Sequence, residues 1–449
     1  MRKDETLNRL ADTINVAQFV AFEPTPNGPS QTYARVFGSS PDERFADMEQ
    51  AVSTLLSRSG EASVNVRSYL PHDKQSKEFV YGLRSAAEAA SAVRRLTAEG
   101  LYTIVNETID VADGGVSGVV LGDVIEFAPD ATPRAVEGSD AASLPRQMGL
   151  AILETVYGFR PAVDLAPEIR LEFSLHPQPR GWRHSHTIGW EFETVRNFDN
   201  AASLRWPNAF SRMIGDKLFG LLVAHHVGLA VPHTLAILRR LAPFSFGTAT
   251  GAAGVWLRTS PREQQPGQYS TVKGWADPFR LLAEEDPDGE VIASVLSQAA
   301  IQARWSGASL VLADGRIVVE GTAGEGAELM LGQSAMQPLP ERVTESVLAV
   351  HEALRRLGPM RFEWVHDDSR TWVVQLHRGV SQSSESMIVP GQARQWRRFD
   401  PGEGLAALRD LISGLPAECG IELTRGVGLT SHVADVLRRA GIVSRFVQS

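Results

Sequence analysis

The sequence has little cysteine: Cys419 is the single one among 449 residues. An internal disulfide and a cysteine-rich metal site are therefore excluded, which favours a reducing, cytoplasmic location. There is also no run of about 18 apolar residues, so we expect no membrane-spanning helix. Residues 1–10 are charged and lack an apolar stretch, so we do not expect a signal peptide.

Positive charge is also scarce, since 44 Lys and Arg face 53 Asp and Glu and leave a net charge of −9. This balance argues against general binding to nucleic acid or to an anionic membrane. Hydrophobic residues make up 43% of the chain, which is enough to build large cores and excludes disorder as the main state. The length suggests two to four domains.

Patterns along the chain predict an α+β protein with mixed sheets, flanking helices and antiparallel hairpins instead of a regular βαβ series. We expect an N-terminal α/β domain over residues 1–200, a second domain over 201–390 and a small α/β tail over 391–449. Within the second domain, the periodicity predicts one helix over 210–227. In the first domain, it predicts one strand over 116–127.

One internal echo spans the two larger domains. Four residues recur with the same identity 191 positions later, and they are Arg67, Arg170, Glu172 and His186, matched by Arg258, Arg361, Glu363 and His377. A degenerate duplication would produce such a series, in which case the N-terminal domain is a decayed copy of the second. A few identities at one offset also arise by chance, and the sequence leaves both explanations open.

Two cations in the second domain are candidates for holding phosphate. Lys217 opens a predicted helix, where a lysine is a mobile point charge. Arg258 lies in a short predicted strand, and its guanidinium offers planar, paired donors to a phosphoryl group. Taken singly, Lys217 is also explained as a surface lysine and Arg258 as the partner of a carboxylate.

Two hairpins follow in the same domain. The first leads from Glu320 into a turn that contains Gly324 and Gly326, where backbone N–H groups can approach a phosphate. The second places Glu363 and Gln375 six residues either side of Ser369, so the two are cross-strand partners on one face. A carboxylate and an amide oxygen side by side suit Mg²⁺. A half-exposed polar face is the alternative.

In this order, the segments resemble the nucleotide-binding domain of the phosphoenolpyruvate synthase, pyruvate phosphate dikinase and rifampin phosphotransferase family, which has an ATP-grasp fold. The matching stretches are IGDKLFGLLVAHHVGLAVPHTLAI, VWLRTSPREQQPGQYST, WSGASLV and FEW…WVVQLHRG. The family pattern has an arginine where His377 stands, with Arg378 next to it. The span from Lys217 to Arg258 is short for the family. We therefore expect part of the family's first lobe to be missing here or to be supplied by another part of the chain.

The resemblance implies a role for each of these residues. ATP would lie between the two hairpins with Mg²⁺ on Glu363 and Gln375. The residues that would contact the nucleotide are Lys217, Arg258, Glu320, Gly324, Gly326, Gln375 and Arg378, with Lys217 and Arg258 also catalytic.

The tail carries a fifth match. The stretch GVGLTSHVADVLRRAGIVSRFV resembles the phosphohistidine segment of the same family, which implies that His432 accepts a phosphoryl group. Thr430 and Ser431 are suitable N-caps, and Gly441 is a suitable helix end. His432 would then stand at a helix N-terminus, where the free N–H groups stabilise an anion.

These features predict an ATP-dependent phosphotransferase of dikinase type, which passes a phosphoryl group from ATP through His432 to an unidentified acceptor. By elimination, residues 1–200 would bind that acceptor or a partner protein, and a homo-oligomer is compatible with the sequence. Two alternatives stay open. One is an ATP-grasp ligase or kinase that uses the same nucleotide site without a phosphoenzyme, and the other is a non-catalytic module that senses ATP.

Overall fold

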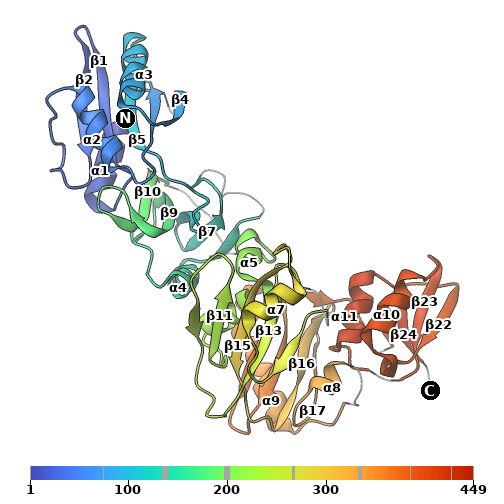
Figure 1. Ribbon diagram of the computed structural model, residues 1–449. Coiled ribbons are helices and arrows are strands. Elements are labelled where there is room, and N and C mark those ends of the chain that lie inside the picture. Colours follow the sequence, from blue (N-terminus) through green and yellow to red (C-terminus); the bar gives the residue numbers. More distant parts are fainter. Residues whose placement is uncertain are drawn as a thin grey trace. The chain divides into compact units, whose positions relative to one another are not determined.

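The computed structural model describes residues 2–73, 75–133, 140–196, 203–264, 268–331, 336–384, 386–425 and 427–447 (Figure 1). The chain forms two compact units, Met1–Arg205 and Trp206–Ser449. The expected division into three domains, at residues 200 and 390, stays a prediction. Within the described ranges, no helix is long and apolar enough to cross a membrane.

The first unit begins with a five-stranded antiparallel sheet in the order β2-β1-β5-β3-β4. Its strands are β1 (Phe19–Thr25), β2 (Gly28–Arg35), β3 (Val64–Tyr69), β4 (Ser76–Leu83) and β5 (Tyr102–Glu107). The helices beside it are α1 (Lys3–Thr13), α2 (Met48–Arg58) and α3 (Ala86–Ala98). The apolar faces of α2 and α3 and the buried side of the strands form one core.

The second sheet of this unit has the order β10-β9-β6-β7-β8. Its strands are β6 (Val116–Leu121), β7 (Val124–Pro129), β8 (Ala142–Pro145), β9 (Ile169–Arg180) and β10 (Ser185–Thr194), and α4 (Arg146–Tyr157) accompanies it. The prediction of one strand over 116–127 is wrong. Gly122 adopts a φ of 56° and turns the chain, so β6 and β7 form a hairpin.

The second unit opens with a lobe built on the sheet β12-β11-β15-β13-β14. Its elements are α5 (Ala209–Ile214), α6 (Asp216–His226), β11 (Thr234–Leu238), β12 (Phe244–Phe246), β13 (Val255–Pro261), β14 (Thr271–Lys273), α7 (Pro278–Glu285) and β15 (Ile292–Ala299). The single helix expected over 210–227 is broken at Gly215, whose φ is 101°. The span from Lys217 to Arg258 is short, but the lobe still forms a complete five-stranded sheet.

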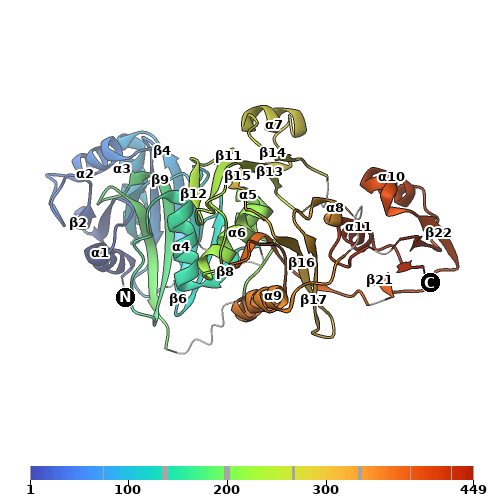
Figure 2. The same ribbon diagram turned by 90° about the horizontal axis from the view of Figure 1, so that it is seen from below.

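The other lobe is the sheet β17-β16-β18-β19, with β20 parallel to β16. Its elements are β16 (Trp305–Leu312), β17 (Ile317–Ala323), α8 (Ala327–Met330), α9 (Glu341–Leu354), the 3₁₀ turn η2 (Arg355–Leu357), β18 (Met360–His366), β19 (Thr371–Arg378) and β20 (Val380–Ser381). Helix α9 packs on this sheet (Figure 2). The predicted hairpin is confirmed, and Glu363 pairs with Gln375 in its register.

The tail is a four-stranded sheet, β21-β24-β23-β22, that includes parallel pairs. Its elements are β21 (Met387–Val389), β22 (Gln395–Phe399), the 3₁₀ turn η3 (Pro401–Glu403), α10 (Gly404–Ser413), β23 (Cys419–Leu423), α11 (His432–Ala440) and β24 (Ser444–Phe446). Its apolar core is continuous with Leu310 and Leu312 of β16. The tail therefore packs directly on the second lobe. The α+β class is confirmed across both units.

The two units share one topology. Strand for strand, β2-β1-β5-β3-β4 matches β12-β11-β15-β13-β14, and β10-β9-β6-β7 matches β19-β18-β16-β17. A β-bulge recurs as well: Trp190 is the extra residue in β10, and Val374 is the extra residue in β19. Chance identities would not reproduce two strand orders and a bulge, so the duplication is the better explanation of the sequence echo.

The register corrects one equivalence in that echo. Glu172 pairs with Glu191 as Glu363 pairs with Gln375, so Glu191 is the counterpart of Gln375. Arg170 pairs with Glu193, whereas Arg361 pairs with His377. His186 is therefore not the counterpart of His377, because the two hairpins have loops of different length and one sequence offset cannot hold through both strands.

Matched glycines test this correspondence. A Cβ at Gly118 would lie 2.4 Å from the Phe173 ring, and one at Gly307 would lie 1.9 Å from the Glu320 carbonyl oxygen. We expect Gly118→Ala and Gly307→Ala each to lower the free energy of unfolding of its own unit by at least about 2 kcal/mol, because neither the fully buried Phe173 ring nor the Glu320 backbone can move freely. Urea unfolding checks this. Gly414→Ala is the control, since its Cβ would meet no atom closer than 3.9 Å.

Candidate functional site

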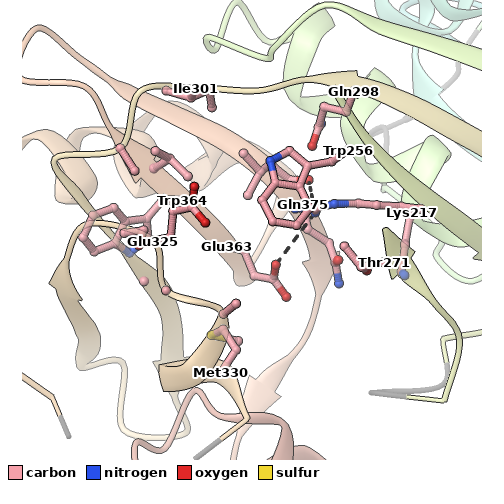
Figure 3. A pocket seen from close by; sticks show the side chains of 18 of the residues that line it. Lys217, Trp256, Thr271, Gln298, Ile301, Glu325, Met330, Glu363, Trp364 and Gln375 are labelled. Carbon is pink, nitrogen blue, oxygen red and sulfur yellow. Dashed lines mark hydrogen bonds and ion pairs between the residues drawn. The ribbon is translucent and has the colours of Figure 1, made fainter. Parts of the chain in front are cut away.

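A cavity of about 410 Å³ in the second unit brings six of the sequence-predicted residues together. They are Lys217, Arg258, Gly326, Glu363, Gln375 and His432. The first two come from the first lobe, the next three from the second lobe, and the last from the tail. Figure 3 shows Lys217, Glu363 and Gln375 extending into the same space from different elements. The structure thus unites residues that are 215 positions apart in the chain, as 432 − 217 gives.

Lys217 is held in an environment that disfavours its charge. Burial, and after it the positive charge of Arg258, lowers the pKa of Lys217 from its ordinary 10.5 to about 8. In the described part of the chain, the ammonium group has no hydrogen bond or ion pair. An anion entering the cavity would therefore gain a desolvated cation that no protein group already neutralises.

Arg258 lies at the base of the cavity. One of its terminal nitrogens donates to the Val374 carbonyl at 3.3 Å and lies 4.0 Å from the Glu363 carboxylate. Burial lowers the pKa of Arg258, and the neighbouring Glu363 opposes that effect. Its Nε is buried without a hydrogen-bond partner. The loose pairing with Glu363 leaves donor capacity for a ligand.

A chain of buried contacts orients Gln375. Trp206 Nε1 donates to one Asp216 carboxylate oxygen at 2.5 Å, and the other oxygen lies 2.8 Å from His377 Nδ1. His377 Nε2 lies 2.6 Å from the Gln375 amide nitrogen, which donates to it when the imidazole is neutral with its proton on Nδ1. This arrangement uses the amide nitrogen and leaves the Gln375 carbonyl oxygen for the cavity.

The other predicted residues lie elsewhere. Gly324 closes the turn after β17, where its carbonyl accepts from Ser306 Oγ at 2.5 Å, and it is not part of the cavity wall. Arg378 is exposed and lines a different cavity. Residues 265–267 of the predicted polar loop lie outside the described part of the chain.

Glu320 has a different position from the one that the resemblance implied. Its carboxylate accepts from the backbone N–H of Leu429 at 2.9 Å and from both the N–H and the hydroxyl of Thr430, at 2.8 and 2.6 Å. A Cβ on Gly428 would lie 2.4 Å from the same carboxylate, so this approach requires glycine. Glu320 therefore fixes the segment that precedes His432, and it does not line the cavity.

His432 is the first residue of α11, as the sequence predicted. Ser431 is the N-cap and accepts from the Ala434 N–H, and Gly441 ends the helix in the left-handed conformation. His432 Nδ1 is buried with no hydrogen-bond partner among the described residues. A helix N-terminus aimed at a cavity with two cations is a favourable place for negative charge.

Several further residues of the wall carry no sequence signal. Trp256, Ile301 and Trp364 form an apolar part of the cavity, and Gln298 adds an amide whose nitrogen is buried without a partner. The backbone between β15 and β16 runs along this part. Such a surface, flat and apolar with one or two polar groups, suits a planar ring system. The sequence places these apolar residues far from Lys217, and the folded sheets bring them to the same cavity.

The paired side chains of Glu363 and Gln375 are the candidate metal ligands of the cavity. Glu363 and Gln375 present hard oxygens from paired positions, which suits Mg²⁺ that also binds phosphate oxygens and water. Among the described residues, no group of three or more His, Cys, Asp and Glu could hold a metal. The pair therefore fits a cation that arrives with a phosphate ligand, and not an all-protein metal cage.

The first unit has changed at a corresponding position of its second sheet. The helix that precedes each first sheet keeps an equivalent contact, since the Asp4 N–H donates to Tyr69 Oη as the Leu218 N–H donates to Ser260 Oγ, so Asp4 corresponds to Leu218. Trp190 takes the bulge position of Val374 and donates to Ser174 Oγ at 2.7 Å. An indole thus replaces the small Val374 side chain that lines the cavity in the second unit.

The chain has only a limited similarity to known proteins. No family model matches the chain, and no curated protein matches its sequence. Similar solved structures include D-alanine–D-alanine ligase from Bacillus anthracis complexed with ATP, at a TM-score of 0.26 and 11% identity over 38% of this chain and 55% of that one. The enzyme of the same name from Helicobacter pylori has a TM-score of 0.26 and 11% identity over 38% of this chain and 53% of its own. Macrocyclase MdnB from Microcystis aeruginosa MRC has a TM-score of 0.24 and 18% identity over 39% of this chain and 55% of its own.

The chain thus spans about half the length of these solved structures. At such TM-scores and identities, the likeness decides nothing about substrate or activity. The side chains of the cavity carry the functional conclusion.

The depressed pKa of Lys217 predicts a specific pH dependence. Between pH 8 and 10.5, the unfolded chain binds a proton at Lys217 that the folded chain has released, so stability rises with pH. We expect Lys217→Met to be more stable than wild type at pH 7, by at most about 3 kcal/mol. The advantage should shrink as pH rises from 8 to 10.

Urea unfolding of both proteins at pH 7, 8, 9 and 10 measures this difference. Lys273→Met is the matched control, because that ammonium group is exposed and pairs with Glu325 at the surface. A difference between wild type and Lys217→Met that stays constant over the whole range would contradict the depressed pKa.

Proposed function

We propose that the cavity of the second unit binds ATP with Mg²⁺ and that this unit catalyses ATP-dependent phosphoryl transfer in an ATP-grasp arrangement. The observation that carries the proposal is the convergence of Lys217, Arg258, Glu363 and Gln375 on one cavity with an apolar end. The purine would lie against Trp256 and Ile301. Lys217 and Arg258 would hold the phosphates and take up the charge that develops in transfer.

Glu363 and Gln375 would hold Mg²⁺, which neutralises phosphate charge when bound. The protein's own contribution is to fix these two oxygens. The Glu363 carboxylate is positioned by its register and by Arg258, and the Gln375 carbonyl by the contact between its amide and His377.

We further propose that His432 is the first acceptor. An imidazole nitrogen would form an N–P bond while the bond from that phosphorus to the leaving nucleotide oxygen breaks. The nucleotide leaves, and the phosphoryl group then passes to a second acceptor. Support comes from the position of His432 on the cavity wall, at the N-terminus of α11, on a segment that Glu320 anchors.

Direct transfer without a phosphoenzyme is the second candidate. Its support is that Lys217, Arg258, Glu363 and Gln375 line the cavity without any contact to His432 being needed to hold them there. The same nucleotide site would serve both routes. In the direct route, His432 would be a wall residue, and the phosphoryl group would go straight to the substrate.

The first unit would bind the acceptor or a partner protein. Its support is indirect: the unit keeps the two-sheet topology but has the large Trp190 where the second unit has Val374 in its cavity wall.

The intact mass of the protein after incubation with ATP and Mg²⁺ at mildly alkaline pH separates the two routes. We expect wild type to gain one phosphoryl group that is labile in acid, and His432→Ala to gain none. His233→Ala is the matched control, since that histidine is exposed in the same unit and is not part of the cavity wall. ATP that binds without any adduct on wild type would favour direct transfer, and no ATP binding at all would contradict both routes.

The Gln375 contact predicts a separate effect on the metal. In His377→Leu, the Gln375 amide loses its acceptor and can rotate, so its carbonyl oxygen no longer stays toward the cavity. We expect the Mg²⁺ concentration for half-maximal activity to rise about tenfold, in the range found for residues that orient metal ligands. The affinity for ATP without metal should change little. Equal changes in both quantities would indicate general damage to the site.

A further inference from the structure

A second cavity of about 430 Å³ lies in the same unit, at the other end of the hairpin formed by β18 and β19. Arginine dominates its charged lining, with Arg361, Arg378, Arg438 and Arg439. Its acidic lining residues are Asp216, Glu263 and Asp435. The proposed nucleotide site does not use these arginines.

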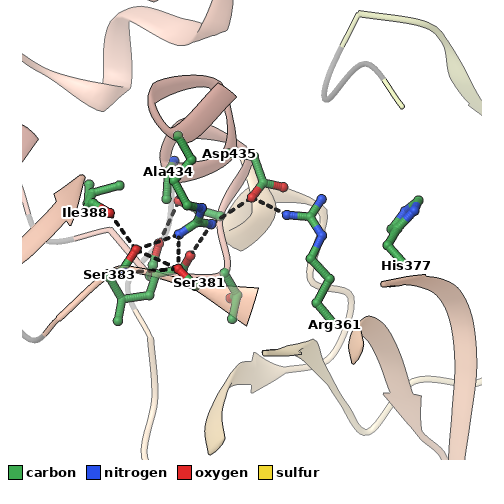
Figure 4. A network of polar contacts seen from close by, with 12 residues as sticks. Arg361, His377, Ser381, Ser383, Ile388, Ala434 and Asp435 are labelled. Atoms are coloured by element: carbon green, nitrogen blue, oxygen red, sulfur yellow. Dashed lines mark hydrogen bonds and ion pairs between the residues drawn. The ribbon is translucent and has the colours of Figure 1, made fainter. Parts of the chain in front are cut away.

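Arginines already pair with two of the acidic residues of this cavity. Asp435 is shared by Arg361 at 2.5 Å, as Figure 4 shows, and by Arg438 at 2.7 Å. The two guanidinium groups lower the pKa of Asp435 against the effect of its burial, so it is ionised at neutral pH. Glu263 pairs with Arg212, which is outside the lining, at 3.1 Å.

The cations of the lining are not balanced in the same way. Two guanidinium groups face the single carboxylate of Asp435, which leaves one positive charge in excess. Arg438 is committed to structure, because it also donates to Ser381, Ser383 and the Leu429 carbonyl. Arg361 has one ion pair, and in the described part of the chain Arg439 has none. An oxyanion in the cavity would balance this excess.

The position of this cavity next to the first is set by secondary structure. Arg361 and Glu363 alternate on one face of β18, so they are about 7 Å apart along the strand. A small cavity between the two larger ones is lined by Arg361, Glu363, Gln375 and His377. On α11, His432 and Arg439 are seven residues and about 10 Å apart on the same face.

We propose that this second cavity binds the oxyanion group, carboxylate or phosphate, of the molecule that receives the phosphoryl group. Arg361 and Arg439 supply the donors, and Arg378 extends the positive charge at the mouth. The acceptor role rests on the proposed function, whereas oxyanion binding rests on the cavity alone. Because the tail is fixed by Glu320 and by Asp435, the acceptor must reach His432 where it stands, and this cavity adjoins it.

The test uses the full chain with His432→Ala, which prevents turnover. The dissociation constant of inorganic phosphate is measured by calorimetry with and without saturating Mg²⁺ and the non-hydrolysable β,γ-imido analogue of ATP. We expect phosphate to bind in both conditions, and Arg439→Gln to weaken binding by about tenfold, as for loss of one charge-assisted hydrogen bond. Arg355→Gln, an exposed arginine of the same unit outside the cavity, should have no effect.

Three results would overturn the proposal: no phosphate binding, binding that the ATP analogue abolishes, or equal affinity in Arg439→Gln. The exposure of Arg439 makes a folding defect in that variant a poor explanation. If the analogue fails to bind while phosphate binds through Arg439, the nucleotide proposal fails and the oxyanion site stands. Repeating the titration with malonate distinguishes the source, since a carboxylate site binds malonate at least as tightly as phosphate.

Discussion

The pairing register of β18 and β19 is the constraint on which the site depends. It sets Glu363 opposite Gln375 and Arg361 opposite His377, all on the face that the cavities share. A slip of β19 by one residue would turn Gln375 and His377 to the other face of the sheet, away from Glu363 and Arg361, which β16 holds in place through β18. The bulge at Val374 brings that residue's carbonyl to Arg258, which ties the hairpin to the first lobe.

The tail depends on that hairpin in turn. The Glu320 carboxylate on β17 accepts hydrogen bonds from the N–H groups before α11, and Arg361 on β18 pairs with Asp435 within α11. Each contact satisfies a group that would be costly to bury alone. The result is a histidine whose place is fixed by two carboxylates from opposite sides of the interface between tail and lobe.

Most of the second unit was predictable because its signals are local. The hairpin around Ser369, the capped helix from Ser431 to Gly441 and the wall residues Lys217 and Arg258 follow from turn chemistry, caps and motif order. The resemblance places Glu320 at the nucleotide, but in the structure Glu320 binds Leu429 and Thr430. These partners are more than 100 residues away in sequence. No local pattern could reveal that contact.

The contact of Asp216 with His377 could not be predicted from the sequence for the same reason, and it gives a local reason for a histidine at position 377. An arginine at position 377 could donate but not accept, so it could not hold the Gln375 amide nitrogen. His377 Nε2 lies 2.6 Å from the Gln375 amide nitrogen and its Nδ1 lies 2.8 Å from an Asp216 carboxylate oxygen, and Asp216 stands next to Lys217 in sequence. One buried carboxylate thus links the orientation of the proposed metal ligand to the helix that carries Lys217. In the first unit, Glu193 occupies the place of His377, and a carboxylate cannot both donate to an aspartate and accept from an amide, so this link belongs to the second unit.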